Sequence, residues 1–251
     1  MISQAERMRL TESICARIVS KYPDDIIVGG VYGSTAMGTS TPRSDLELLC
    51  ITRAGSRIEK KKFIYRDIAV SVSIIAQDEL ERALTSSPSQ WCYYMTVLSQ
   101  LKTLYGPPNL LDAWLELGRS MHAGKLREWV EENVGLLLTE PYGRIFSCLE
   151  RQNTRDIGTA VSELLVGMMN VLCLLNKRWV THGYYLGLID TFSFPKLPKG
   201  YATIIPKITS SHDPEEIASL SETLVSNFWS LLDDEDIRRP TVYQTLNDLP
   251  I

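Results

Sequence analysis

The chain lacks a long hydrophobic run. Its most apolar stretch, LLVGMMNVLCLL at 164–175, has twelve residues and contains Asn170, whereas a membrane-spanning helix needs about 20 apolar residues. The N-terminal stretch MISQAERMRLTES is polar and helical in character, with no apolar core of a signal peptide. We therefore expect a buried helix at 164–175 and a soluble, cytoplasmic protein.

Cysteine and histidine are also scarce. The five cysteines lie far apart without a CxxC pair, and His122, His182 and His212 are scattered along the chain. These spacings do not indicate a zinc cluster, a disulfide framework or a histidine-based catalytic group. Most of the cysteines have apolar neighbours, so we interpret them as reduced core residues.

An excess of basic residues is missing as well. The chain of 251 residues has 26 Lys and Arg against 30 Asp and Glu, a net charge of -4 and a pI near 5.5. A general nucleic-acid binder needs a positively charged surface, so this composition argues against that class and predicts neither a nucleic-acid nor a membrane partner. A mildly acidic protein suits a cationic small substrate, although most acidic proteins bind nothing cationic.

The periodicity of apolar residues changes along the chain. Residues 3–21 have helical spacing, two β-rich runs (IIVGGVYG and LELLCIT) follow, residues 63–75 alternate as one further strand, and a helix begins near Gln77. Beyond residue 110 the pattern is almost wholly helical, and 194–206 is a Pro- and Gly-rich connection. We predict an α/β domain at 1–122 and a helical bundle at 123–251, with helices near 110–121, 124–138, 140–152, 156–180 and 213–232.

A Gly/Ser/Thr-rich loop followed by two acids is the most informative motif. In GVYGSTAMGTSTPRSDLELL, Asp45 and Glu47 are two apart in a β-rich run and point to the same face. Paired carboxylates favour a hard cation such as Mg²⁺. Gly33 permits close backbone approach, and Ser34 can begin a helix whose free N–H groups face a phosphate. The motif is neither a P-loop nor a dinucleotide fingerprint, and a Gly-Ser turn followed by a solvated acid pair remains an alternative interpretation.

The order strand, Gly-Ser, spacer and D-x-E resembles the signature of the DNA polymerase β-like nucleotidyltransferase superfamily. A closer resemblance covers nearly the whole chain. The segments AERMRL, GVYGS with SDLELLC, TEPYGR, LPKGY and NFW look like those of the aminoglycoside 4′-O-nucleotidyltransferases, the kanamycin nucleotidyltransferase group. This resemblance implies an α/β (α+β) nucleotidyltransferase domain with a mixed sheet, followed by a C-terminal α-helical bundle.

The resemblance also implies roles for individual residues. Asp45 and Glu47 would bind Mg²⁺, and Ser34 would contact nucleotide phosphate, with Gly33 giving the space. Glu140 matches the general base that takes the proton from the sugar hydroxyl, and Arg144, one helical turn later, would hold a phosphate. From the residues alone, Glu140 is more simply an acid near a helix N-terminus, with Pro141 in the first turn.

Two positions depart from the family pattern. Met37 stands where the family carries an arginine three residues after the Gly-Ser serine, and Arg43 is a candidate replacement for that phosphate contact. The superfamily places a third carboxylate on the following strand, where this chain has Ser71; Asp67, four residues earlier, is a candidate substitute. These departures affect the nucleotide contacts and the number of metal ions more than the reaction class.

The sequence as a whole leads to one functional hypothesis. We expect an enzyme that transfers AMP from Mg·ATP, or another nucleoside triphosphate, to a hydroxyl of an aminoglycoside such as kanamycin or tobramycin, with the 4′-hydroxyl as the expected site. Resistance to the antibiotic would follow. The resemblance implies a homodimer whose active sites are shared by both subunits. The alternatives are the same chemistry on another acceptor, or a non-catalytic nucleotide- or partner-binding member such as an antitoxin module.

Overall fold

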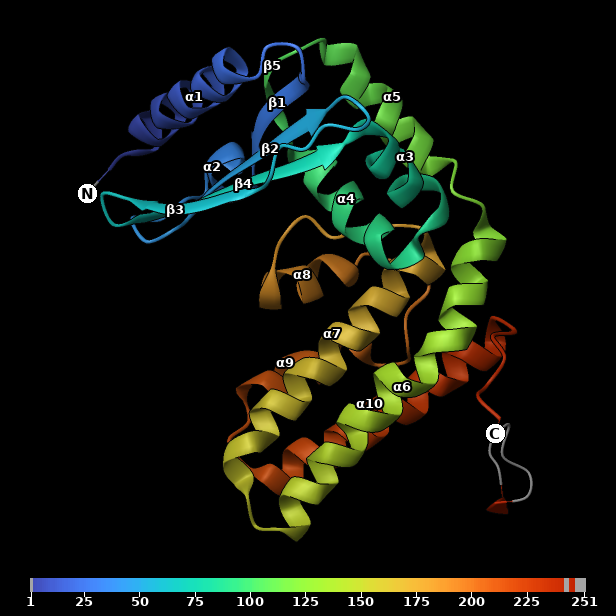
Figure 1. Ribbon diagram of the computed structural model, residues 1–251. Coiled ribbons are helices and arrows are strands. Elements are labelled where there is room, and N and C mark those ends of the chain that lie inside the picture. The colour runs from blue at the N-terminus through green and yellow to red at the C-terminus, as the bar shows by residue number, and fades with distance from the viewer. Residues whose placement is uncertain (1, 242–243, 247–251) are drawn as a thin grey trace. The chain divides into compact units, whose positions relative to one another are not determined.

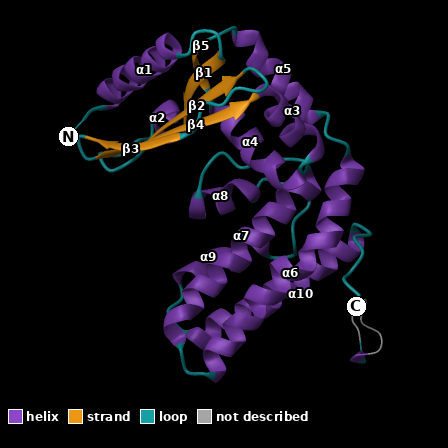
Figure 2. Cartoon of the chain, viewed as in Figure 1, coloured by secondary structure: helices purple, strands orange, loops and turns teal. Residues whose placement is uncertain are grey.

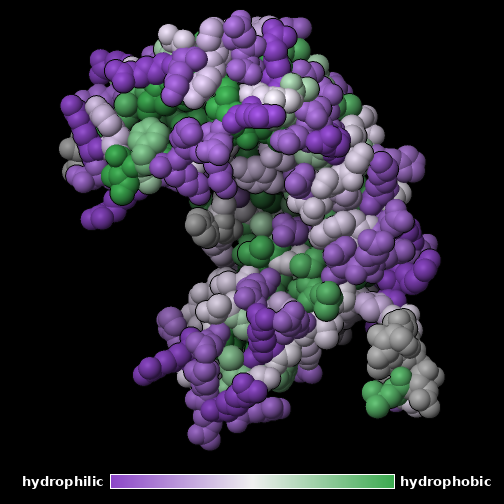
Figure 3. All heavy atoms as spheres, in the orientation of Figure 1, coloured by the Kyte–Doolittle hydropathy of each residue, from purple (hydrophilic) through white to green (hydrophobic). Residues whose placement is uncertain are grey.

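The computed structural model describes residues 2–241 and 244–246, and the chain forms two compact units, 1–122 and 123–251 (Figure 1). The first unit combines a sheet with helices, and the second is helical (Figure 2). On the face shown in Figure 3, hydrophilic residues cover most of the surface of each unit, with apolar residues in patches between them. The predicted fold class, a mixed α/β sheet followed by helices, is confirmed.

The first unit is built on a five-stranded mixed sheet with the strand order β3-β4-β2-β1-β5. Strands β2 and β4 are parallel, and the other neighbouring pairs are antiparallel. The strands are β1 (Ile26–Tyr32), β2 (Leu46–Thr52), β3 (Lys61–Tyr65), β4 (Ile68–Ala76) and β5 (Lys102–Tyr105). The helices of this unit are α1 (Gln4–Lys21), α2 (Gly33–Met37), α3 (Gln77–Ser86), α4 (Pro88–Gln100) and α5 (Pro108–Arg119).

Helices cover both faces of this sheet (Figure 1). Alternate residues of β2, namely Leu46, Leu48 and Cys50, form a buried cluster with Cys15 of α1, so α1 packs on this face. The Ser3 side chain and Glu6 cap α1 reciprocally, in a capping box. Helices α3 and α4 lie on the opposite face, which is the face of the second alternating set of β2 residues. Glu47 belongs to that second set.

The prediction of one strand over 63–75 was wrong. Strands β3 and β4 are antiparallel and meet at a two-residue turn, Arg66-Asp67, in which both residues have positive φ values of 46° and 66°. Two consecutive left-handed residues are the geometry of the tight turn that joins twisted strands. The turn was missed because it lacks Asn-Gly or Asp-Gly and because the alternation of apolar residues continues across it.

The second unit contains five α-helices and one short 3-10 helix in its described part. They are α6 (Ala123–Glu150), η1 (Thr154–Asp156), α7 (Ile157–Asn176), α8 (Tyr184–Thr191), α9 (Tyr201–Ser210) and α10 (Pro214–Asp234). Helices α6 and α7 pack against each other along much of their length. The expected helices at 110–121, 156–180 and 213–232 correspond to α5, α7 and α10, with ends that differ by up to four residues.

Two predictions in the second unit were wrong. Helices expected at 124–138 and 140–152 are one continuous helix, α6, with Pro141 inside it. Proline removes one hydrogen bond, but the buried stripe continues through it, since Leu138, Pro141 and Ile145 are all buried at helical spacing. The segment 194–206, expected as a connection, becomes helical at Tyr201, after Gly200 in the left-handed conformation.

The apolar stretch at 164–175 lies within α7, as expected. Residues Thr154–Asn176 are long and apolar enough to cross a membrane by length and composition, and 61% of their most apolar window is buried inside the protein. Leu164, Met168, Val171 and Leu172 are all fully covered. This burial is that of a core helix in a helical unit.

Candidate active site

The Gly-Ser pair lies where β1 turns into the short helix α2. Strand β1 ends at Tyr32, and Gly33 begins α2 with a positive φ of 68°. Only glycine adopts this conformation readily. Ser34 follows in the first turn of α2, and both residues are half-buried. The structure therefore presents the hydroxyl of Ser34 and the first backbone N–H groups of α2 at the end of β1.

The two acids lie at the start of the neighbouring strand, β2. Asp45 precedes the strand and is exposed, and Glu47 is its second residue and is half-buried. A Cβ atom built on Gly33 would overlap Oε2 of Glu47, so this carboxylate occupies the space that the missing side chain leaves. Burial, and then the negative charge of Asp45, raise the pKa of the Glu47 carboxyl. The predicted Gly33, Ser34, Asp45 and Glu47 are thus brought together at one end of the sheet.

The strands on either side of β2, β1 and β4, supply hydroxyl groups to the face of the sheet that carries Glu47. In the sheet register, Glu47 pairs with Tyr32 on β1 and with Ser71 on β4. The Tyr32 hydroxyl lies 3.5 Å from Oγ of Ser73, and burial raises the pKa of the Tyr32 phenol. Ser71 therefore stands directly beside Glu47, where the family resemblance predicts a third carboxylate, whereas Asp67 lies in the exposed β3–β4 turn.

Two carboxylates and nearby hydroxyls provide oxygen donors for part of the coordination shell of a hard divalent cation. Within residues 2–241 and 244–246, no group of three or more His, Cys, Asp and Glu side chains is placed to hold a metal ion. Burial and then the charge of Asp45 raise the pKa of Glu47, and a cation bound to both carboxylates would offset the burial cost and their mutual repulsion. Mg²⁺ commonly binds through one or two carboxylates and completes its shell with phosphate oxygens and water, which fits this pair.

The arginine expected after the Gly-Ser pair has no replacement in direct contact with the acids. Met37, at the end of α2, is 37% exposed. Arg43 lies in the exposed turn before Asp45, where its backbone N–H donates to Oγ1 of Thr41 at 3.3 Å. Its guanidinium makes no ion pair with the part of the chain that the structure describes. Arg43 is therefore accessible to a ligand beside Asp45.

A residue that the sequence interpretation did not select, Arg7, holds the loop before Asp45. Arg7 is 1% exposed, and its guanidinium donates to three backbone carbonyls: Nη1 to Ser44 at 2.8 Å and Asp45 at 3.3 Å, and Nη2 to Pro42 at 3.2 Å. The spacing of Arg7, Thr11 and Cys15, four residues apart on the buried face of α1, was the available signal, because an arginine on an apolar helix face needs buried partners.

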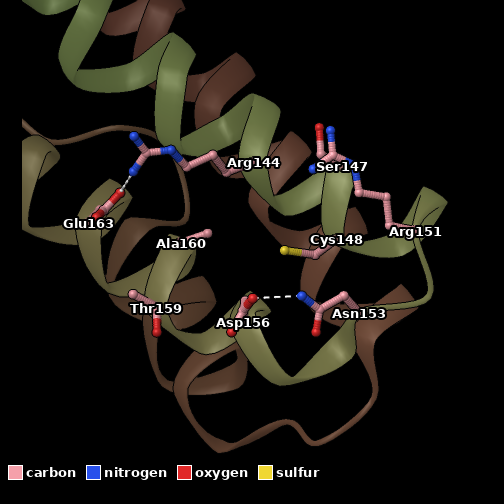
Figure 4. Close-up of a pocket in the computed structure, with 9 residues that line it drawn as sticks. All are labelled: Arg144, Ser147, Cys148, Arg151, Asn153, Asp156, Thr159, Ala160 and Glu163. Atoms are coloured by element: carbon pink, nitrogen blue, oxygen red, sulfur yellow. Dashed lines mark hydrogen bonds and ion pairs between the residues drawn. The ribbon is translucent and has the colours of Figure 1, made fainter.

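The expected base and its basic neighbour lie on α6 in the second unit. Glu140 and Arg144 are one turn apart on one face, with Oε1 of Glu140 2.5 Å from Nη2 of Arg144. Arg144 also pairs with Glu163 of α7 (Figure 4). Glu163, and then Glu140, raise the pKa of the Arg144 guanidinium. Both partners of the predicted pair are exposed, so the arginine binds two carboxylates at the surface of this unit.

Arg144 also borders a cavity of about 270 Å³ between the end of α6 and the start of α7. Figure 4 shows Ser147 and Cys148 of α6, with Arg151 just after its end, on one side and Asp156 and Thr159 on the other. Asn153 donates to the carboxylate of Asp156 at 2.6 Å. The cavity is lined by both acidic and basic residues. Its two acids are paired within the lining, Asp156 with Asn153 and Glu163 with Arg144.

Comparison with known proteins supports the family resemblance. No protein-family model matches the chain. Two aminoglycoside nucleotidyltransferases (4′), from Bacillus sp. and Staphylococcus aureus, are each 21% identical over 238 residues, 92% of this chain and 90% of theirs. The crystal structure of a nucleotidyltransferase-like protein from Exiguobacterium sibiricum 255-15 aligns with a TM-score of 0.49 and 16% identity, covering 89% of this chain and 75% of that one. The predicted resemblance to the aminoglycoside nucleotidyltransferases is confirmed, at low sequence identity over most of the chain.

Proposed function

We propose that this protein transfers AMP from Mg·ATP to a hydroxyl of an aminoglycoside, the 4′-hydroxyl, and releases pyrophosphate. The nucleotidyl chemistry is supported by the carboxylates of Asp45 and Glu47 beside Gly33 and Ser34. The acceptor is supported by the names of the two relatives. Adding a bulky anion to a polycationic drug would spoil its fit to ribosomal RNA, so the proposed role is antibiotic resistance in the cytoplasm.

Each group has a defined part in this reaction. A divalent ion held by Asp45 and Glu47 would neutralise charge on the triphosphate. Ser34 and the first N–H groups of α2 bind phosphate oxygens, for which Gly33 leaves room. Arg43 and Arg144 bind phosphate, since a guanidinium matches phosphate oxygens bidentately. Glu140 accepts the proton of the attacking hydroxyl as the new bond to phosphorus forms.

The observation that carries this proposal is the Glu47 carboxylate against Gly33, with Asp45 two residues before it acting on its charge. Asp45 is the residue that tests the proposal. Asp45→Asn keeps the size of the side chain, so we expect a folded protein that transfers no AMP. The assay incubates protein, ATP, Mg²⁺ and a panel of aminoglycosides, and mass spectrometry detects the gain of one AMP. Asp67→Asn, an exposed acid in the β3–β4 turn, is the matched control. Full turnover by Asp45→Asn contradicts the metal assignment.

The proposed homodimer with shared active sites has a direct test in the same assay. If each site combines Asp45 of one subunit with Glu140 of the other, then mixing inactive Asp45→Asn and Glu140→Gln subunits restores activity at one site of each mixed dimer. When the two variants mix randomly in equal amounts, half of the dimers are mixed and each has one active site of two, so about a quarter of the wild-type rate is expected. If the mixture is as inactive as each variant alone, although subunits are shown to exchange between dimers, the active sites are not shared.

A second candidate is a nucleotide-binding protein without transfer activity. It is favoured by Ser71, which pairs with Glu47 in the sheet register where a third carboxylate is expected. Losing one acid weakens metal binding and removes a possible proton acceptor. Calorimetry distinguishes the two, because this candidate binds ATP with Mg²⁺ but gives no mass gain with any acceptor in a wide panel of hydroxyl compounds.

A further inference from the structure

The segment that leads into β3 and continues to the β3–β4 turn is basic in an acidic protein. Residues 57–67, RIEKKKFIYRD, contain five basic and two acidic residues, whereas the whole chain has a net charge of -4. Lys62 is exposed and, within residues 2–241 and 244–246, makes no ion pair. Its neighbour Lys61 lies 3.9 Å from Glu59. The charge of Lys62 is therefore available to a ligand.

The sheet register places Lys62 on the face of the candidate site. Lys62 pairs with Ser71, Ser71 pairs with Glu47, and Glu47 pairs with Tyr32. Residues directly opposite each other on neighbouring strands project to the same face. Two strand spacings separate Lys62 from Glu47, or about 10 Å between backbones. Ser71 between them is small, so the lysine stem can extend over it toward the acids.

The order of the strands then separates two sides of the site. The Gly33–Ser34 turn lies beside β1, and the β3–β4 hairpin lies on the other side of Glu47. In phosphoryl and nucleotidyl transfer, the attacking and leaving oxygens are roughly in line on opposite sides of phosphorus. With the leaving pyrophosphate toward Ser34, the attacking hydroxyl comes from the side of β4 and β3. This step depends on the proposed function.

We propose that the acceptor binds over β4 and β3 and that Lys62 is a specificity-determining residue for it. The lysine repels an ammonium group next to the reacting hydroxyl and tolerates a hydroxyl there. Ser71 adds to this preference, because its neutral side chain supplies no negative charge to hold an amine. The favoured acceptors are therefore those that present hydroxyl groups, without an amine, around the reacting position.

The test compares two probes on one protein. Neomycin and paromomycin differ by an amino or a hydroxyl group on the ring that carries the 4′-hydroxyl. Steady-state AMP transfer gives kcat/KM for each, and their ratio is the readout. We expect wild type to prefer paromomycin, Lys62→Met to reduce the preference, and Lys62→Glu to shift the ratio toward neomycin by about three- to tenfold, less at high salt.

Lys61 provides the matched control on the same strand. It pairs with Val72 and belongs to the opposite face of the hairpin, so Lys61→Glu changes the net charge equally without facing the acceptor. We expect its ratio to equal that of wild type. Equal ratios for Lys62→Glu and wild type overturn the proposal, and so does an equal shift in Lys61→Glu, which would indicate a general charge effect.

A binding measurement keeps this proposal distinct from the proposed function. Calorimetry with Mg²⁺ and a non-hydrolysable ATP analogue gives the affinity for each probe without turnover. If no variant transfers AMP but Lys62→Glu still shifts the neomycin-to-paromomycin affinity ratio, the transfer function fails and the subsite stands. If transfer occurs and neither ratio depends on Lys62, the function stands and the subsite fails. Absence of binding of both probes to wild type and Lys62→Glu also overturns the subsite.

Discussion

The buried guanidinium of Arg7 donates a hydrogen bond to the backbone carbonyl of Asp45, 3.3 Å away. The same nitrogen donates to the carbonyl of Ser44 at 2.8 Å. Gln4, one turn earlier on α1, donates to the carbonyl of Thr35 at 2.6 Å in α2. Helix α1 thus fastens both ends of the loop that carries the Gly-Ser pair and the first acid, and the loop's geometry depends on a helix outside the motif.

Replacing Arg7 by methionine keeps much of the side-chain stem and removes all three hydrogen bonds. We expect the free energy of unfolding to fall by roughly 2–4 kcal/mol, since three partly buried hydrogen bonds from a charged donor are lost. Affinity for Mg²⁺ should also fall, because Asp45 is no longer fixed. Urea denaturation and calorimetry measure these effects. Arg17→Met, an exposed position on the same helix, should change stability by about 0.5 kcal/mol or less, and equal effects of the two variants would contradict this role.

Alanine substitutions at Gly33 and Gly38 distinguish the cost of backbone strain from the effect of overlap with the Glu47 carboxylate. Both have positive φ values, 68° and 77°, but only at Gly33 would a Cβ atom meet Glu47, whereas nothing lies within 4 Å of a Cβ at Gly38. Alanine at either position costs about 1 kcal/mol of backbone strain. Gly33→Ala should in addition displace the Glu47 carboxylate and lower AMP transfer at least about tenfold. Thermal unfolding and the transfer assay measure the two effects, and full activity of Gly33→Ala would be evidence against this geometry.

The pH dependence of stability reports on Glu47. Its carboxyl has an ordinary pKa of 4.5 in the unfolded chain, and burial followed by repulsion from Asp45 raises it in the folded protein. A raised carboxyl pKa contributes stability that is fully present below the unfolded pKa and is lost as pH rises through the folded pKa. At neutral pH without metal, the ionised Glu47 therefore lowers the stability of the native state.

Glu47→Gln is accordingly expected to stabilise the metal-free protein at neutral pH and to flatten its stability profile just above pH 4.5. With Mg²⁺ we expect wild type to be more stable than Glu47→Gln, because a cation that binds two carboxylates stabilises the ionised wild type more than the variant. Denaturation midpoints across pH, with and without Mg²⁺, measure this. A variant less stable than wild type in the absence of metal would show that Glu47 has an unidentified favourable partner.

The site motif was predictable because strand geometry is local. Residues two apart on a strand share a face, so Asp45 and Glu47 were paired by spacing alone, and Gly33 was placed by the need for close approach. Strand register is not local. The pairing of Glu47 with Ser71 and of Ser71 with Lys62 depends on the Arg66-Asp67 turn, whose two left-handed residues carry no strong sequence signal.

The remaining differences between the sequence-based predictions and the structure result from tertiary packing. Pro141 was read as a helix start, but the buried stripe of α6 runs through it and keeps the helix continuous. Arg7 was part of a recognised motif, yet its role depends on carbonyls of residues 42–45, which only the folded loop brings to it. Both cases are long-range contacts that overrule a local preference.

Glu140 and Glu163 provide the sharpest test of the proposed base. Both pair with Arg144, the pair with Glu163 being drawn in Figure 4, and both are exposed. Replacing either by glutamine therefore removes one ion pair from the same arginine. Only Glu140 is proposed to accept the proton of the acceptor hydroxyl. We expect Glu140→Gln to lower kcat by about 10²–10⁴-fold with little change in stability.

The same substitution at Glu163 should lower kcat by less than about fivefold, since an exposed ion pair contributes about 1 kcal/mol or less. Single-turnover rates at saturating ATP and acceptor measure both variants, and circular dichroism checks that each is folded. Similar losses in the two variants would assign the effect to the position of Arg144 and would remove Glu140 from the chemistry. A large loss in Glu140→Gln alone requires a role that the shared ion pair cannot supply.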